Sequence, residues 1–255
     1  MVLTLDIGNT NIKSAVFQGE TMVRYWRLRT DITTTSDELG IKMRSLFGHG
    51  GLEPSCLDGI IMSSVVPSIN FTVDHMCRDY FGLTPMQVAP GVKTGVNIRY
   101  ENPRELGSDR IANAVACYAL YGGPSIFVDF GTATTFGVLS ERGEFLGGAI
   151  CPGLKISTEA LVSGAAKLPR VELVKPESVI GRNTVTNMQA GFYYGYVGLV
   201  ENIVRKMKEE IGCPDARVIA TGGLARLLEP DAKEINVFDG LLTLKGLRLI
   251  YERNL

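Results

Sequence analysis

Two short segments of the sequence share an arrangement of residues that could bind phosphate and metal. In the first, Asp6 ends an alternating apolar segment and is followed by Gly8, Asn9 and Thr10. Period-two alternation predicts a strand, and Gly and Asn, which tolerate positive φ, favour a turn after it. A strand pattern resumes at Ile12, which predicts a hairpin with a polar tip. Such a tip offers an oxygen ligand for a divalent metal and N–H and O–H donors for a polyphosphate.

The same plan recurs in the middle of the chain. An apolar segment leads to Asp129, and Gly131, Thr132 and Thr134 follow before a second apolar segment. The two aspartates are 129 − 6 = 123 residues apart, nearly half of the 255-residue chain. One such hairpin alone is most often an ordinary turn, so it is the repeat that favours a ligand site. A duplicated half predicts a nucleotide held between two similar lobes.

Two carboxylates that face one polyphosphate would repel it, so we expect each to act through a bound cation. Asp6 suits Mg²⁺, which keeps several waters and takes few direct protein ligands. Thr10 and Thr132 would donate hydrogen bonds to phosphate oxygens. Lys13 could neutralise phosphate charge, and an ordinary lysine on the strand surface is an equal alternative.

Asp109 is the candidate general base. Ser108 and Asp109 precede a predicted helix, where such residues are preferred caps and where the helix dipole favours a carboxylate. Plain capping is therefore an equal alternative. The same position keeps the carboxylate ionised, and phosphoryl transfer needs little more than a group that orients a hydroxyl and takes its proton late. Arg110 could bind a substrate carboxylate through two hydrogen bonds, or form a surface salt bridge.

Composition and charge exclude several other classes of protein. Hydrophobic residues make up 45% of the chain and charged residues 21%, which permits a sizeable interior. The formal net charge of −1 gives no reason to expect a nucleic-acid partner, which usually requires a basic face. No apolar run reaches the ~18 residues of a membrane span, and no leader peptide precedes Asp6. We therefore predict a cytoplasmic protein with no membrane partner.

The cysteines, the histidines and the absence of glycine-rich nucleotide-binding motifs exclude further kinds of site. The five cysteines are scattered without C-x-x-C spacing, which argues against zinc and disulfides and favours buried free thiols. Only His49 and His75 occur, so a histidine triad or a histidine-ligated metal is not expected. Neither G-x-x-x-x-G-K-[ST] nor G-x-G-x-x-G is present. Proton transfer must therefore depend on carboxylates.

Hydrophobic periodicity predicts the elements that position these residues. The first hairpin and a strand at 21–29 form an antiparallel trio, and a capping box at Thr35 and Glu38 starts a helix. A buried strand follows at 59–66, parallel to its neighbour. The later elements are a loop-like stretch at 86–106, a helix at 111–120, a second antiparallel trio ending with strands at 134–139 and 144–150, helices at 157–163, 184–211 and 241–251, and a strand–glycine turn–helix unit at 218–224. Thr184 is expected as a helix cap.

In combination, residues 6–13, 107–110 and 129–134 and the glycine-rich turn at 147–153 resemble the type III pantothenate kinases. This family belongs to the superfamily of acetate and sugar kinases, Hsp70 and actin, and the resemblance runs from Met1 to about the last helix. It implies ATP-dependent phosphorylation of pantothenate to 4'-phosphopantothenate, the first step of coenzyme A biosynthesis. It also implies a cytoplasmic homodimer that requires Mg²⁺ or another divalent cation and a monovalent cation, K⁺ or NH₄⁺.

The resemblance also implies a role for each matched position. Asp109 is the proton acceptor, Asp129 holds the monovalent cation, and Asp6 binds Mg²⁺ directly or through water. The long helix after Thr184 is the candidate dimer interface. ATP is expected to contact Asp6, Ile7, Gly8, Asn9, Thr10, Asn11, Ile12, Lys13 and Thr132. Pantothenate is expected to contact Tyr100, Gly107, Ser108, Asp109, Arg110 and Thr184.

We therefore expect an α/β fold with two ribonuclease-H-like lobes of the actin-like ATPase kind. Each lobe should contain a mixed sheet that opens with three antiparallel strands and is flanked by helices. The expected lobes are 1–113 and 114–255, with the last helix in the second lobe or packed back on the first. Two alternatives remain open. One is a non-catalytic transcription accessory factor of the same family, which an intact Asp109 argues against. The other is a different small-molecule kinase or an actin-like ATPase of the superfamily.

Overall fold

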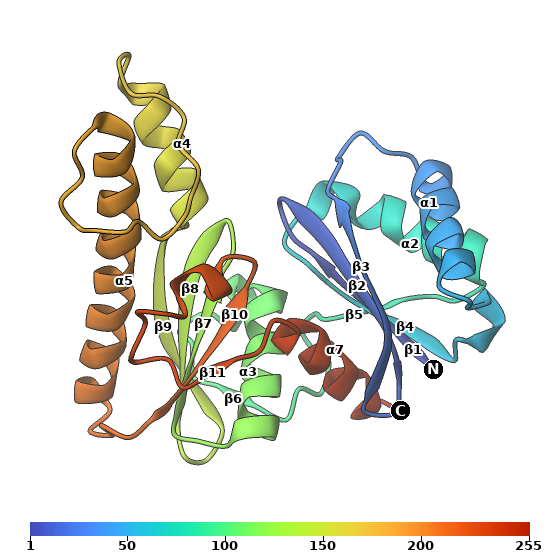
Figure 1. Ribbon diagram of the computed structural model, residues 1–255. Helices are drawn as coiled ribbons and strands as arrows, with labels where there is room; N and C mark the ends of the chain where they lie inside the picture. Colours follow the sequence, from blue (N-terminus) through green and yellow to red (C-terminus); the bar gives the residue numbers. More distant parts are fainter. The chain divides into compact units, whose positions relative to one another are not determined.

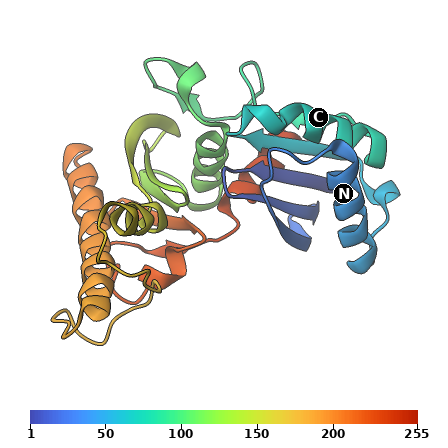
Figure 2. The same cartoon turned by 90° about the horizontal axis from the view of Figure 1, so that it is seen from above.

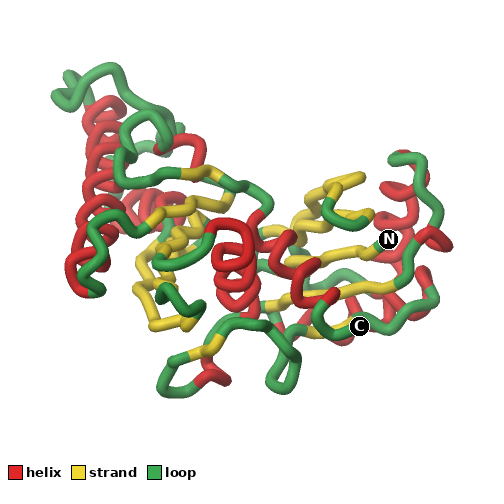
Figure 3. The backbone as a smooth tube through the Cα atoms, turned by 90° about the horizontal axis from the view of Figure 1, so that it is seen from below, coloured by secondary structure: helices red, strands yellow, loops and turns green.

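A computed structural model describes residues 1–255, which divide into two compact units (Figure 1). Unit 1 comprises Met1–Gly95, Glu101–Ala116 and Leu242–Leu255, and unit 2 comprises Val96–Tyr100 and Cys117–Leu241. Each unit has its own sheet and its own hydrophobic core. Within each unit, Figure 3 shows the strands in one layer with helices beside it. No helix has both the length and the apolar character required to cross a membrane.

The sheet of unit 1 has the strand order β3-β2-β1-β4-β5. The first three strands pair antiparallel and β4 pairs in parallel with β1, as the hydrophobic pattern predicts. β5 pairs in parallel with β4 and extends the sheet by one strand that the pattern does not predict. The strands are β1 (Val2–Ile7), β2 (Asn11–Gln18), β3 (Thr21–Arg29), β4 (Gly59–Ser64) and β5 (Met86–Gln87). The pair Met86–Gln87 lies in the stretch that was expected to be loop.

Helices cover both faces of this sheet (Figures 1 and 2). Leu3, Leu5 and Ile7 point from one face into a core shared with α1 (Ser36–His49) and α2 (Asn70–Phe81). The opposite face packs against α7 (Leu242–Glu252). Because successive side chains on a strand point to opposite faces, Asp6 lies on the α7 side of the sheet.

Two helix starts in unit 1 test the sequence signals directly. The capping box of α1 is confirmed: Thr35 Oγ1 accepts the Glu38 N–H at 3.2 Å, and Glu38 Oε2 accepts the Thr35 N–H at 2.9 Å. In contrast, α3 (Ser108–Tyr121) begins three residues earlier than its predicted start at 111. Ser108 and Asp109 therefore form the first turn of this helix instead of preceding it.

The sheet of unit 2 repeats the pattern of unit 1, with the order β11-β10-β7-β8-β9-β6. The run β9-β8-β7-β10-β11 corresponds strand by strand to β3-β2-β1-β4-β5, with the same parallel and antiparallel pairings. β6 is an addition at the β9 edge. The strands are β6 (Asn97–Ile98), β7 (Ser125–Phe130), β8 (Ala133–Leu139), β9 (Glu144–Pro152), β10 (Arg217–Gly222) and β11 (Val237–Phe238).

The long helix α5 (Thr184–Glu210) packs on this second sheet through Tyr193, Tyr196 and Val200. Its N-cap is Asn183, whose side chain accepts the Thr186 N–H at 2.9 Å, so the expectation that Thr184 caps the helix is wrong. The remaining helices are α4 (Leu154–Gly164), which starts three residues before its predicted position, and α6 (Ala225–Leu228). All five cysteines are free; Cys77 and Cys117 are buried, and the other three are only partly buried.

Candidate functional site

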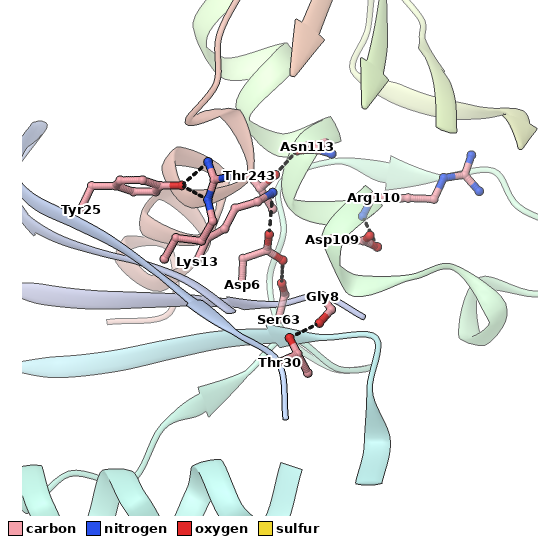
Figure 4. A network of polar contacts seen from close by, with 11 residues as sticks. Asp6, Gly8, Lys13, Tyr25, Thr30, Ser63, Asp109, Arg110, Asn113 and Thr243 are labelled. Atoms are coloured by element: carbon pink, nitrogen blue, oxygen red, sulfur yellow. Dashed lines mark hydrogen bonds and ion pairs between the residues drawn. The ribbon is translucent and has the colours of Figure 1, made fainter. Parts of the chain in front are cut away.

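Asp6 is held by the strands on either side of it. The register pairs it with Lys13 on β2 and with Ser63 on β4. Ser63 Oγ donates to Asp6 Oδ1 at 3.0 Å, and Lys13 Nζ lies 3.3 Å from Oδ2 (Figure 4). Asp6 is only 6% exposed, so these contacts act in a poorly hydrated environment where they fix the carboxylate. The lysine is thus an ion-pair partner and not a bare surface residue.

The turn that follows Asp6 is shaped by close packing and not by positive φ. The predicted turn is present between β1 and β2, but it needs no positive φ: no non-glycine residue has one, and Gly8 is not among the glycines that do. The Gly8 N–H instead donates to the Asn11 carbonyl at 3.0 Å, and a Cβ on Gly8 would lie 3.2 Å from the same oxygen. Ile7 and Ile12 are buried in the core on either side of the turn. Their side chains anchor it, which leaves Asn9 and Thr10 exposed at its tip.

The start of α3 is attached to the end of β4. Ser108 Oγ accepts the Ser64 N–H at 3.0 Å and donates to the Ser64 carbonyl at 3.2 Å. Asp109 Oδ1 accepts the Arg110 N–H at 2.8 Å, and a Cβ on Gly107 would lie only 2.5 Å from that oxygen. Gly107 therefore leaves the room that the Asp109 carboxylate occupies. The Ser108 hydroxyl hydrogen-bonds the backbone of β4. This role differs from the plain helix capping considered above.

These contacts join the two candidate carboxylates of unit 1 in one polar network. Asp6 is bonded to Ser63, the next residue is bonded to Ser108, and Asp109 follows directly in the chain. Figure 4 shows Asp6, Ser63 and Asp109 around the end of β4 and the start of α3. Arg110 is buried, and its guanidinium extends away from the Asp109 carboxylate in this view. Sequence patterns gave no role to Ser63; its only signal was a polar residue inside a buried strand.

Unit 2 contains the second carboxylate and turn. The register places Thr135 of β8 and Thr221 of β10 on either side of Asp129. The second turn is one residue shorter, because Phe130 and Thr134 enclose residues 131–133, whereas Ile7 and Ile12 enclose residues 8–11. This single deletion puts a threonine opposite Asp129 where a lysine stands opposite Asp6. The two aspartates therefore occupy matching positions in different electrostatic surroundings.

The backbone approaches Asp129 closely at the end of β10. Gly222 has a φ of +95°, and a Cβ there would lie 2.6 Å from Asp129 Oδ1. Only glycine adopts this conformation readily and leaves the required space. The strand–glycine turn predicted at 218–224 thus lies beside the second carboxylate.

A hollow of about 620 Å³ lies beside the exposed Thr132. This open hollow is lined by the second turn, the end of β9 and one side of α4, all within unit 2. Its lining is mostly apolar and consists of Thr132, Ala133, Ile150, Cys151, Pro152, Ile156, Ser157 and Ala160.

The other residues predicted to contact substrate lie in unit 2. Tyr100 is half-buried, with its ring centroid 6.3 Å from that of Phe145, and Thr184 is exposed as the first residue of α5. Residues 107–110 belong to unit 1.

The side chains that could bind a metal limit the kinds of cation that fit this structure. The structure contains no group of three or more His, Cys, Asp and Glu side chains that could enclose a metal. Single carboxylates such as Asp6 and Asp129 fit ions that retain water or are shared with phosphate oxygens, as Mg²⁺ usually is.

Known proteins of one family are similar to this chain over most of its length. The family description "Type III pantothenate kinase" matches residues 2–206. The type III pantothenate kinase of Halalkalibacterium halodurans is 52% identical over 254 residues, which cover 100% of both chains.

Two solved structures show the fold. A conserved protein of Campylobacter jejuni, described provisionally as a Baf family transcriptional activator, superposes with a TM-score of 0.62 at 20% identity, covering 99% of this chain and 98% of the other. The ROK hexokinase of Thermus thermophilus superposes with a TM-score of 0.52 at 15% identity, again over 99% and 98%. The predicted fold class, two mixed sheets with helices in the actin-like ATPase fold of sugar kinases, is confirmed. With this fold, and with sequence identity along its whole length, the chain belongs to the type III pantothenate kinase family.

Proposed function

We propose that this chain transfers the γ-phosphoryl group of ATP to the primary hydroxyl of pantothenate, which forms 4'-phosphopantothenate for coenzyme A biosynthesis. The observation that supports this most directly is the polar network from Asp6 through Ser63, Ser64 and Ser108 to Asp109. These hydrogen bonds connect the proposed phosphate-side carboxylate, Asp6, with the proposed base-side carboxylate, Asp109, within unit 1. Phosphoryl transfer depends chiefly on such positioning and on charge stabilisation.

In this proposal the first turn and Thr132 bind the triphosphate. The exposed Asn9 and Thr10 and the neighbouring backbone donate hydrogen bonds to phosphate oxygens, while Ile7 and Ile12 contribute only through their backbone because their side chains are buried. Lys13 lies next to Asp6 and adds positive charge near the phosphates. Asn11 completes the turn through its carbonyl, which accepts from Gly8.

Asp109 acts as the proton acceptor. The pantothenate hydroxyl oxygen forms a bond to the γ-phosphorus, the bond from that phosphorus to the bridging oxygen breaks, and ADP leaves with the electron pair. The hydroxyl proton passes to the Asp109 carboxylate. Its position in the first turn of α3 favours the ionised form that this step requires.

The remaining assignments concern pantothenate and the cations. Arg110 is the proposed partner of the pantothenate carboxylate, and contacts with Tyr100, Gly107, Ser108 and Thr184 complete the substrate site. Asp6 is the proposed Mg²⁺ ligand, directly or through water, and Asp129 the proposed ligand of K⁺ or NH₄⁺. When bound, these cations neutralise phosphate charge. We also propose a homodimer that forms through unit 2 along α5, which light scattering of the purified chain can test.

A comparison of two aspartates tests the proposed reaction. The wild type is assayed with ATP, Mg²⁺, K⁺ and pantothenate, beside Asp109→Asn and the control Asp37→Asn. Asp37 is a matched control because it also lies in the first turn of a helix of unit 1, where it accepts a hydrogen bond from Tyr80 Oη. We expect Asp109→Asn to lower kcat about 100-fold or more, as the loss of a general base usually does, with an unchanged melting temperature. Asp37→Asn should retain wild-type kcat.

Two results would contradict the proposal. An absence of pantothenate turnover by the wild type under these conditions rejects the reaction itself. Wild-type kcat in Asp109→Asn rejects the role of this residue as the proton acceptor.

A further inference from the structure

Each of the two turns is held by the residue that directly follows the third strand of its sheet. In unit 1, Thr30 follows β3 and donates its N–H to the Thr10 carbonyl at 3.0 Å. In unit 2, Gly153 follows β9 and donates its N–H to the Thr132 carbonyl at 3.0 Å. Because β3 and β9 occupy equivalent places in the two sheets, the two units share the same backbone hydrogen bond to their turns.

The side chains at these two positions differ. Thr30 Oγ1 adds a second hydrogen bond, to the Gly8 carbonyl at 2.6 Å (Figure 4). Gly153 cannot do the same, since even a Cβ there would lie 2.2 Å from the Thr132 carbonyl oxygen and 2.6 Å from that of Gly131. The second turn therefore packs directly on the backbone of Gly153, and residue 153 contributes no side-chain hydrogen bond to it.

Beside the second turn, a hydroxyl group from α5, that of Tyr196, bonds the residues that flank the turn. Its Oη hydrogen-bonds Thr134 Oγ1 and donates to the Pro152 carbonyl at 2.9 Å. Thr134 lies just after the second turn, and Pro152 just before Gly153, so one phenol links the strand that leaves the turn to the strand that holds it. Tyr196 is 6% exposed and Thr134 is 1% exposed. Burial raises the pKa of Tyr196 above its usual value, so its phenol is protonated well above neutral pH as well as at it.

The direction of these hydrogen bonds matters for a phosphate ligand. In a trans peptide unit the C=O and the following N–H point in opposite directions, and the one cis bond in the chain is Gly123-Pro124. The Gly8 carbonyl points toward Thr30, so the N–H of Asn9 points away from Thr30. In the same way the Thr132 carbonyl points toward Gly153, so the N–H of Ala133 points away from Gly153. Carbonyl oxygens repel phosphate oxygens, whereas N–H groups attract them.

We propose that Thr30 and Tyr196 are positioning residues, which hold the two turns so that N–H groups and not carbonyls face the triphosphate. The inference rests on the proposed function in one respect, because it takes the triphosphate of ATP as the ligand. The bracing itself is a property of the free protein and can be measured without substrate.

The test in unit 1 compares three variants. Thr30→Val removes the hydroxyl while it keeps the shape, Thr30→Ser retains the hydroxyl, and Thr33→Val is the control. Thr33 lies in the same loop, where its hydroxyl bonds Asp31 Oδ1 at 2.6 Å and not the turn. We expect Thr30→Val to raise the Kd and KM for ATP about fivefold, the value of one hydrogen bond of about 1 kcal/mol. The KM for pantothenate should not change. Thr30→Ser and Thr33→Val should match the wild type.

The test in unit 2 compares two tyrosines of α5. Tyr196→Phe removes the hydroxyl between Thr134 and Pro152. Tyr193→Phe is a closely matched control, because Tyr193 is also buried and its Oη donates to Asp231 at 2.8 Å, away from the turn. Both variants should lose stability, but only Tyr196→Phe should raise the Kd for ATP. A Tyr196→Phe, Thr134→Val double variant should add little to that rise, because the two hydroxyls bond each other.

Hydrogen exchange in the free protein provides a readout that does not depend on activity. Faster exchange of the amides at 8–11 in Thr30→Val and at 131–133 in Tyr196→Phe supports the inference. Unchanged exchange and unchanged ATP affinity in both variants overturn it, whatever their stability. An equal loss of ATP affinity in Tyr193→Phe also overturns it, since the effect would then belong to the packing of α5. If the wild type binds ATP but does not phosphorylate pantothenate, the proposed function fails while a raised Kd in Thr30→Val still supports the bracing role.

Discussion

Ser108, the first residue of α3, is bonded through its hydroxyl to both backbone groups of Ser64, the last residue of β4. The pairing of β4 with β5 extends only to Met62, so the end of β4 lacks a strand partner on that side. The serine side chain takes the place of that strand. It thereby attaches the helix that carries Asp109 to the strand that carries Ser63, the donor to Asp6.

Replacement of Ser108 by alanine should weaken both stability and activity. The Ser64 N–H would lose its hydrogen-bond partner, which should reduce the free energy of unfolding by about 1–3 kcal/mol, and a displaced Asp109 should lower kcat. Urea denaturation and the coupled assay measure the two effects. Ser163→Ala is the control, because its exposed hydroxyl bonds only Ala160 within α4. Equal stability of the two variants would contradict the role given to Ser108.

Replacement of Ser63 by alanine should change the response to Mg²⁺. Without the Ser63 hydroxyl the Asp6 carboxylate keeps Lys13 but is free to rotate, so we expect half-maximal activity to require severalfold more Mg²⁺. The control is Ser14→Ala, a buried serine of the same sheet whose hydroxyl lies 3.5 Å from the Trp26 carbonyl. A magnesium titration of both variants decides the matter. The same midpoint for both would show that Ser63 does not affect the proposed binding of Mg²⁺ at Asp6.

Replacement of Gly246 by alanine should loosen α7. A Cβ at this position would lie 1.9 Å from the Ala112 carbonyl oxygen of α3, and backbone atoms cannot yield as a side chain can. We expect a loss of about 1–3 kcal/mol of stability, the usual cost of overpacking, with a lower melting temperature.

Gly48→Ala in α1 is the control for this substitution, since a Cβ there meets nothing within 4 Å. It should be neutral or stabilise the protein by up to about 1 kcal/mol through helix propensity. A neutral Gly246→Ala would mean that α7 is not tightly packed on α3.

Stability should fall as the pH rises above 9. Burial raises the pKa of the Cys77 thiol and of the Cys117 thiol from 9.0 to about 12. A raised folded-state pKa contributes stability that is fully present below the unfolded pKa and is lost as the pH rises toward the folded one. The window is therefore pH 9 to about 12. Denaturation at pH 8 and pH 10 measures the slope, which should be shallower in a Cys77→Ala, Cys117→Ala double variant. Identical slopes would contradict the assignment.

The sequence by itself determined the local elements and indicated the candidate site residues. The alternation around Asp6 and Asp129 predicts two hairpins, the Thr35 capping box fixes the start of α1, and the long apolar period after 184 predicts α5; all are present. These features depend on interactions within a few residues, so a local pattern contains the information that specifies them. The start of α3 and the cap of α5 were misplaced, since each depends on which one of several adjacent polar residues finds a partner.

Only the tertiary structure decided which side chains hold the site together. Ser63 reaches Asp6 across 57 residues, Ser108 reaches Ser64 across 44, and Tyr196 reaches Thr134 across 62. No local period encodes such contacts, because they arise only after parallel pairing fixes the register of β1 against β4 and after α5 packs on the second sheet. A shift of one residue in that pairing would turn every side chain of the strand to the other face, so the register, and not the motif alone, places Ser63 beside Asp6.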